Sequence, residues 1–173
     1  MMVSRPVDAR FSIGKRFGEW GPLWNYYMDE YGRLVKGKIP RDSKRIPRET
    51  LLAYPISQFF GTHTGIDMIG DKDNPIKDAQ VMAVETGLVE YAKTTDIDGG
   101  WGKYIREKFL VDGVPFYAYY CHLAEIFFKT GQPIMKNEII ALVGNTGNAT
   151  GYHLHFELRD KEGRPIEPVF YNV

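Results

Sequence analysis

Apolar and polar residues alternate with a period of two through most of the chain after residue 54. This is the period of a strand with one buried face, because successive side chains of a strand point to opposite faces of the sheet. Strands are predicted in 79–94 with a break at Thr86-Gly87, in 103–110, in 114–123, in 139–143 and in 152–160. Asp112-Gly113 is a strong signal for a two-residue hairpin turn between the second and third of these segments. The pattern predicts a mainly β fold with an antiparallel sheet.

The first third of the chain has a less regular pattern. Short apolar alternation followed by the turn glycines of GKRFGEWG predicts a first strand or hairpin. The segment WNYYMDEYGRL (24–34) predicts a short helix, so one or two short helices are expected in all. The charged segment that follows holds two prolines and predicts a surface loop. The predicted organisation is one domain over 1–173, with the first strand or hairpin in 1–20, an insertion or loop region in 21–53 and the core in 54–171.

Composition and charge narrow the class of protein. The chain has 173 residues, 43% of them hydrophobic and 25% charged, which suits a single globular domain. The formal net charge of +0 argues against nucleic acid as a partner, since phosphate binding needs clustered Lys and Arg. No apolar run reaches the roughly 18 residues of a membrane span. The first residues lack the apolar stretch of a secretory signal, so the chain is expected to use another export route, such as phage-type release, or to have lost a leader.

The candidate chemistry lies in the histidines. All four fall in three short motifs: His63 in GTHTGID, which also holds Asp67, His122 at the end of FYAYYCHL, and His153 with His155 in GYHLHFEL. A hydrolytic zinc needs three protein ligands, a position left open for water and nearby groups that accept and donate protons. These five side chains are enough for both tasks.

Spacing indicates how two of the motifs could converge. His153 and His155 are two residues apart, so in a strand they project from the same face. His63 and Asp67 are four apart, but the glycines and threonines of their segment disfavour a helix. In a straight strand their Cα atoms would lie about 13 Å apart. They can reach one ion only if the chain bends, and Gly65 is the natural place for the bend.

The third motif contains the one cysteine of the chain, which excludes an intrachain disulfide. In a continuous strand His122 shares a face with Tyr120, whereas Cys121 points the other way. Cys121 is therefore predicted to be a small buried apolar residue that points away from the site. His122 is a candidate acid, base or oxyanion stabiliser. Residue chemistry alone leaves open which three of the five side chains hold the metal.

Taken together, the motifs resemble the lysostaphin/LytM-type zinc endopeptidases, which cut peptidoglycan. The resemblance is carried by GTHTGID, by YYCHL and most specifically by GNTGNATGYHLHFELRDKEGRPIEP, and it covers about residues 54–171. The opening RPVDARFSIGKRFG is similar to the first strand of that family. Residues 21–53 have no counterpart, and Cys121 stands where the family has a small residue.

The resemblance implies that His63, Asp67 and His155 bind one Zn²⁺ per chain, while His122 and His153 are catalytic. The implied fold is an antiparallel sheet with a groove over the metal. The implied reaction is hydrolysis of a stem-peptide or cross-bridge bond of peptidoglycan by a metal-activated water, at the bacterial cell wall. Separately, the chain is expected to be a monomer. An additional catalytic tyrosine is not assigned, and the candidates for it are Tyr54, Tyr119 and Tyr120.

Two other functions are compatible with the sequence. One is a catalytically inactive module that binds the wall or regulates another hydrolase, for which metal ligands are expected to be lost. The other is a component of a phage-type cell-puncturing device, which is compatible with catalysis.

Overall fold

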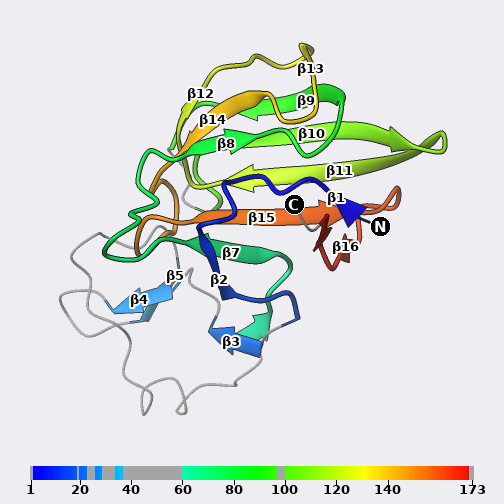
Figure 1. Cartoon of the computed structure of the whole chain (residues 1–173). Helices are drawn as coiled ribbons and strands as arrows, with labels where there is room; N and C mark the ends of the chain where they lie inside the picture. Colours follow the sequence, from blue (N-terminus) through cyan, green and yellow to red (C-terminus); the bar gives the residue numbers. More distant parts are fainter. Residues whose placement is uncertain are drawn as a thin grey trace.

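The computed structural model describes residues 2–18, 20–22, 26–28, 34–36, 60–96 and 100–171, and these form a strand-rich fold built around one large antiparallel sheet (Figure 1). Neighbouring strands of the large sheet pair antiparallel throughout. In spatial order the strands are β13 (Pro133–Ile134), β9 (Gly87–Lys93), β10 (Tyr104–Val111), β11 (Val114–Cys121), β15 (Leu154–Arg159), β7 (Ile66–Ile69) and β2 (Ser12–Lys15), with β16 (Pro165–Ile166) beside β15. The prediction of a mainly β, antiparallel fold is confirmed.

Smaller sheets complete the described part of the fold. A three-stranded sheet consists of β12 (Leu123–Ile126), β14 (Ile139–Val143) and β8 (Gln80–Met82). Three two-stranded pairs are β1 (Met2–Val3) with β17 (Val169–Phe170), β3 (Trp20–Pro22) with β6 (Phe60–Thr62), and β4 (Tyr26–Met28) with β5 (Leu34–Lys36). The β1–β17 pair is parallel and brings the two ends of the described chain together (Figure 1).

The hydrophobic core joins one face of the large sheet to the three-stranded sheet. Ile105, Tyr120 and Phe156 of the large sheet belong to the same buried cluster as Val81 and Ile140 of the small one. Burial of each such side chain stabilises the fold by about 1.5–3 kcal/mol. A slip of one residue in β15 would turn Phe156 outward, so the core fixes the register of this strand. The same register fixes the direction of His155 and Glu157, which alternate with the apolar residues of β15.

The structure has a turn at Asp112-Gly113 and a break before Gly87, as the sequence predicted. β10 and β11 are joined at Asp112-Gly113, and both residues have positive φ, at 51° and 77°. These values suit the two-residue turns whose twist matches that of paired strands. The break expected at Thr86-Gly87 separates β8 from β9, which belong to different sheets.

Two expectations for the first third of the chain are not met. Of the two alternatives for residues 1–20, a first strand or a hairpin, the hairpin is not found: strands β1 and β2 are present, but β1 pairs with β17 and β2 pairs with β7. No helix occurs in the residues that the structure describes, and the segment for which a short helix was predicted contributes β4. Aromatic residues such as Tyr26 and Tyr27 favour strands, which agrees with β4 in this place. Most of 21–53 lies outside the described residues, so its predicted role as an insertion remains a prediction.

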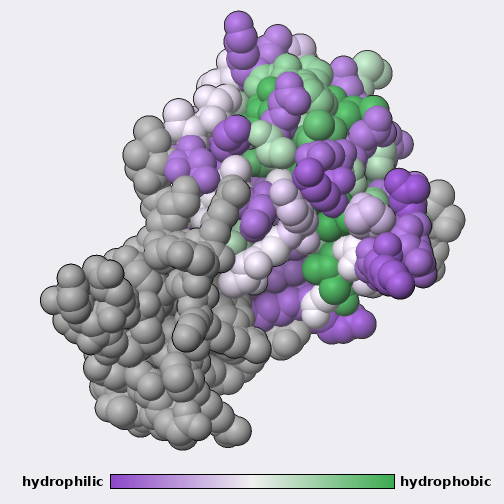
Figure 2. Space-filling view, turned by 90° about the vertical axis from the view of Figure 1, so that its left-hand side faces the viewer, coloured by the Kyte–Doolittle hydropathy of each residue, from purple (hydrophilic) through white to green (hydrophobic). Residues whose placement is uncertain are grey.

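One face of the molecule carries a continuous area of apolar surface (Figure 2). In the view toward the end at which β15 begins, apolar surface gathers in the upper part, on the side of β12, β13 and β14, and hydrophilic residues predominate below it (Figure 2). Phe127, Met135 and Ile139 are exposed in this part of the chain. No helix among the described residues is long and apolar enough to cross a membrane.

One carboxyl group is enclosed in the core. Glu107 of β10 is fully buried; its side chain accepts hydrogen bonds from the Tyr120 hydroxyl and from the backbone N–H of Glu85 (3.3 Å). Burial raises the pKa of Glu107 from 4.5 to about 7, although these hydrogen bonds act in the opposite direction. Below about pH 7 the buried carboxyl is therefore mainly neutral, because ionisation would leave a charge out of water.

Replacing Glu107 by Gln is therefore expected to change how stability depends on pH. In the wild type the unfolded chain releases this proton near pH 4.5 and the folded chain only near pH 7, so the free energy of unfolding falls across that window by roughly 3 kcal/mol. In Glu107→Gln the new amide has no proton to lose, and its oxygen can still accept the Tyr120 hydrogen bond. Reversible urea unfolding of both proteins with a chelator, from about pH 5 to about pH 8, measures the difference. A difference that stays constant over this range would contradict the assignment.

Candidate metal centre

The register of β7 and β15 places two of the predicted site residues side by side. Asp67 pairs directly with His155, and Met68 pairs with Leu154. Leu154, Met68 and Phe156 lie in the core, so Asp67 and His155 project from the opposite face of the sheet. Directly opposed residues of an antiparallel pair have Cβ atoms about 4.5–5.5 Å apart, which is within reach of a shared ion.

A bend brings His63 to the same place. β6 ends at Thr62 and β7 begins at Ile66, so the strand is interrupted over residues 63–65. Gly65 allows the bent segment to approach β15 closely: a Cβ at this position would lie 2.3 Å from the carbonyl oxygen of Phe156. Any larger residue would push the bend away from β15. The expected bend between His63 and Asp67 is confirmed.

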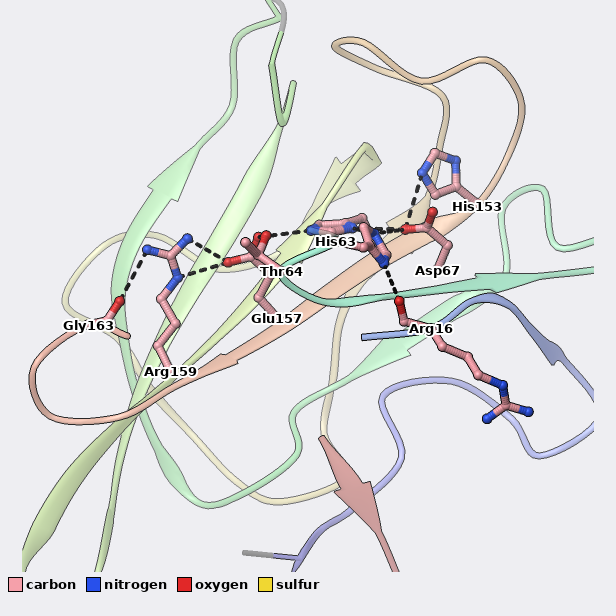
Figure 3. A network of polar contacts seen from close by, with 9 residues as sticks. Arg16, His63, Thr64, Asp67, His153, Glu157, Arg159 and Gly163 are labelled. Carbon is pink, nitrogen blue, oxygen red and sulfur yellow. Dashed lines mark hydrogen bonds and ion pairs between the residues drawn. The ribbon is translucent and has the colours of Figure 1, made fainter. Parts of the chain in front are cut away.

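Three ligand atoms converge at this point. His63 Nε2 lies 3.0 Å from His155 Nδ1 and 3.1 Å from Asp67 Oδ1, and His155 Nδ1 lies 2.8 Å from Asp67 Oδ1 (Figure 3). Among the described residues they form a group that could hold a metal ion. Ligands of a tetrahedral Zn²⁺, each about 2.0–2.1 Å from the ion, are separated by about 3.3 Å. The observed spacing is close to that value.

Hydrogen bonds on the far side of each ring define which nitrogen faces the centre. His63 Nδ1–H donates to the backbone carbonyl of Arg16 (3.0 Å), and His155 Nε2–H donates to Glu157 Oε1 (3.0 Å). A carbonyl and a carboxylate can only accept, so these nitrogens carry the hydrogens. The other ring nitrogens then present lone pairs to one another and to the Asp67 carboxylate, an arrangement that only a proton or a cation can stabilise. It is the outer hydrogen-bond pattern typical of metal-binding histidines.

The charges of the centre are strongly coupled. Burial on its own would raise the pKa of Asp67, but hydrogen bonds with His155 and His63 hold it far below its ordinary value. Burial likewise lowers the pKa of His155, but hydrogen bonds with Asp67 and Glu157 raise it to about 9. In the metal-free protein at neutral pH, His155 therefore carries a second proton, on Nδ1.

Zinc binding is expected to displace this proton. The displacement makes the affinity for zinc rise about tenfold per pH unit from about pH 6 to about pH 8, because a metal ligand must be deprotonated. Competition with a chromophoric chelator measures the dissociation constant at each pH, and titration calorimetry in buffers of different ionisation enthalpy counts the protons released. A dissociation constant independent of pH would contradict the coupling between His155 and Asp67.

His122 lies near the three converging residues, although simple strand alternation would point its side chain to the other face of the sheet. Its φ is 63°, a left-handed conformation that is uncommon for a residue with a side chain and costs on the order of 1–3 kcal/mol. β11 ends one residue earlier, and this kink turns the His122 ring to within 6.0 Å of the His155 ring and 4.6 Å of the His153 ring, measured between centroids.

The prediction for Cys121 is partly wrong. The thiol is fully buried, as expected, but Cys121 pairs directly with His155 and so projects from the same face of the sheet as the site. The error arose because the alternation was extended through His122, where the positive φ reverses the direction of the side chain.

The two remaining histidines have matching tautomers. His122 Nδ1–H donates to the carbonyl of Thr146 (2.8 Å), and His153 Nδ1–H donates to the carbonyl of Gly151 (2.9 Å). Each ring therefore presents a lone pair on Nε2. Burial, together with the nearby His153 and His155, lowers the pKa of His122 to about 3, and burial lowers that of His153. Both are neutral at pH 7, and each can accept a hydrogen bond at Nε2. His153 Nε2 lies 3.9 Å from Asp67 Oδ1, farther than the three converging atoms are from one another.

The three candidates for an additional catalytic tyrosine differ in their position relative to the site. Tyr120 lies in the core on the other face of the sheet, where its hydroxyl bonds Glu107, so it is not available to the site. Tyr119 faces the site side but is covered by the guanidinium of Arg159, which lies 4.8 Å from its ring centroid. Tyr54 lies outside the described residues.

Sequence reasoning did not identify the residues that support the ligands. Glu157 and Arg159 follow His155 at steps of two along β15, and the same period that paired His153 with His155 would have placed them on the site face. The contacts of Thr64 and of the Arg16 carbonyl depend on the bend and on the pairing of β2 with β7, for which the sequence carries no local signal.

Comparison with known proteins gives consistent matches. The sequence model of Peptidase family M23 matches residues 61–168. An uncharacterized metalloprotease of Haemophilus influenzae is 35% identical over 116 residues, which cover 67% of this chain and 22% of that protein. Peptidoglycan DD-endopeptidase ShyA of Vibrio cholerae is 30% identical over 173 residues, covering 94% of this chain and 36% of that one. Lysostaphin is among the other matches. The resemblance noted in the sequence is confirmed.

The fold has solved counterparts. A zinc-containing peptidase from Vibrio cholerae superposes with a TM-score of 0.63 at 24% identity, over 100% of this chain and 41% of that chain. At this identity the likeness concerns the fold. The chain spans between about a fifth and two fifths of the length of these relatives.

Proposed function

The chain belongs to peptidase family M23, and on that premise we propose that it is a zinc-dependent endopeptidase that hydrolyses peptide bonds of bacterial peptidoglycan. The observation that carries the proposal is the convergence of His63 Nε2, Asp67 Oδ1 and His155 Nδ1 within about one zinc coordination sphere. The substrate class is supported by relatives that are named peptidoglycan endopeptidases. The site of action that follows is the bacterial cell wall.

In this proposal His63, Asp67 and His155 are the metal ligands. Two neutral imidazoles and one carboxylate are a donor set that suits zinc. When bound, zinc supplies a Lewis acid that polarises the scissile carbonyl and makes a water acidic enough to lose its proton near neutral pH. The ring of His122 lies beside this donor set, with its centroid 4.6 Å from that of His153 and 6.0 Å from that of His155.

The two catalytic histidines handle protons. His153 is the better proton acceptor, because the cation that forms on it lies 3.9 Å from the Asp67 carboxylate. As the water oxygen bonds to the carbonyl carbon, its proton passes to His153 Nε2, and when the C–N bond breaks this proton passes to the leaving amine. His122, buried and neutral, accepts a hydrogen bond through Nε2 and so orients the attacking water.

Purified sacculi provide the test of this function. Zinc-loaded protein is expected to release muropeptides from sacculi, to stop doing so with 1,10-phenanthroline and to recover when zinc is restored. Mass spectrometry of the products identifies the bond that is cut. If zinc-loaded, folded protein cleaves no peptide bond in sacculi of several cross-bridge types, the proposal fails.

The non-catalytic alternative has less support. A module that only binds the wall or regulates another hydrolase is expected to have lost metal ligands, whereas His63, Asp67 and His155 are all present and converge. Placement in a phage-type puncturing device remains a prediction that is compatible with the proposed activity.

A further inference from the structure

A buried carboxylate stands directly behind the proposed zinc ligand His155. Glu157 is fully buried, on the same face of β15 as the site. Its Oε1 accepts hydrogen bonds from His155 Nε2–H (3.0 Å) and from the hydroxyl of Thr64. Its Oε2 accepts two from the guanidinium of Arg159, from Nε at 2.8 Å and from Nη2 at 2.6 Å (Figure 3). Both carboxylate oxygens are thus committed to donors of the protein itself.

Arg159 is itself held from several sides. Its guanidinium lies over the rings of Trp101 (5.3 Å to the centroid) and Tyr119 (4.8 Å), and Nη1 lies 3.4 Å from the carbonyl of Gly163. Planar stacking and a two-pronged bond to a carboxylate are contacts that arginine makes and lysine does not. Arg159 therefore supplies Glu157 with a fixed compensating charge, which a buried carboxylate requires.

The network has a direct consequence for His155. An ionised carboxylate can only accept, so it requires the hydrogen of the neutral imidazole to be on Nε2 and leaves the lone pair on Nδ1. Nδ1 is the atom that faces His63 and Asp67. Without Glu157 the ring could rotate about its side-chain bonds or adopt the other tautomer, and either change removes one of three ligands.

The same network extends to the other parts of the site. Thr64, which donates to Glu157, is the residue after His63 in the bend. Trp101, which stacks on Arg159, accepts the backbone N–H of His122 at its carbonyl oxygen (2.9 Å). Glu157 and Arg159 are therefore connected to all the segments that carry the proposed site residues, although neither reaches the reacting atoms.

We propose that Glu157 and Arg159 form a positioning pair that fixes the tautomer and orientation of His155 for zinc, with Thr64 tying the pair to the bend that carries His63. The inference rests on the proposed zinc site. The proposal adds that Arg159 acts through Glu157. Substitutions of Arg159 and of Glu157 are therefore expected not to have independent effects on zinc affinity.

Zinc affinity is the first measurement. Glu157→Gln keeps the size of the side chain but not the charge, and is expected to weaken zinc binding by about 10–100-fold. Arg159→Lys is expected to weaken it in the same direction, and the double variant to be little worse than Glu157→Gln alone, because residues of one network are not additive. The matched controls are Glu162→Gln and Arg164→Lys, in the exposed turn after β15. Dissociation constants come from competition with a chromophoric chelator, and thermal unfolding of the metal-free proteins confirms that each variant is folded.

The second measurement needs no substitution. In zinc-loaded wild-type protein, long-range ¹H–¹⁵N spectra of the imidazoles are expected to show His155 protonated at Nε2 and bound through Nδ1. Protonation at Nδ1, or a zinc affinity of Glu157→Gln equal to that of Glu162→Gln, would overturn the positioning role and leave the proposed function intact. Wild-type protein that binds no zinc would overturn both.

Discussion

Replacing His155 by alanine is expected to abolish zinc binding and peptide hydrolysis together. His155 Nδ1 lies within 3.0 Å of both of the other converging ligand atoms, so it occupies one corner of the proposed coordination sphere. Two ligands, His63 and Asp67, would remain, and a site with two protein ligands holds zinc far less firmly than one with three. Metal analysis after gel filtration is expected to give about one zinc per chain for the wild type and none for His155→Ala.

A folding control is necessary because His155 is buried. Its removal leaves Glu157 and Asp67 without a hydrogen-bond partner on that side, which can destabilise the sheet. His155→Gln retains a polar group of similar reach and is expected to fold and still fail to bind zinc. A folded His155→Ala variant with a full complement of zinc would show that the ligands have been assigned incorrectly.

The β fold was predictable because its signals are local. Asp112-Gly113 specifies a tight turn, and the alternation on either side of it specifies two strands with one buried face each. The same period predicted that His153 and His155 project together, and His153, the residue before β15, has its Nε2 3.9 Å from Asp67 Oδ1. The pairing of β1 with β17 joins residues from the two ends of the chain, and no local pattern encodes it.

Part of the candidate site was predictable because the chain has only four histidines and all of them lie in three short motifs. Gly65 indicated the bend, since it stands between two potential ligands in a segment that cannot be helical. The direction of Cys121 was misjudged because His122 has a backbone φ of 63°, which period-two reasoning does not include. Glu157 and Arg159 were overlooked for a different reason: as an acidic and a basic residue on a strand they look like solvent-exposed residues, and only the structure shows that Glu157 is fully buried.

Replacing His153 by alanine is expected to have the opposite signature, with zinc retained and turnover reduced by about 10²–10⁴-fold. His153 Nε2 lies 3.9 Å from Asp67 and outside the set of converging atoms, so it is not among the proposed ligands. Its tautomer, fixed by the Gly151 carbonyl, presents a lone pair to the site, and Asp67 stabilises the cation that forms when a proton arrives. The loss should appear mainly in kcat, because proton transfer belongs to the transition state rather than to substrate binding.

Comparing His155→Ala with His153→Ala under the same conditions tests which residue is a metal ligand and which is a base. Both substitutions remove an imidazole at positions two residues apart, His153 just before β15 and His155 within it, so general effects of truncation are similar. Zinc content distinguishes a ligand from a base, and muropeptide release at saturating zinc measures what each residue contributes to turnover. A small increase in rate with added imidazole in His153→Ala, and none in His155→Ala, would support proton transfer by His153. Zinc lost from His153→Ala and retained by His155→Ala would reverse the two roles, and the bend at Gly65 would then have to serve a different set of ligands.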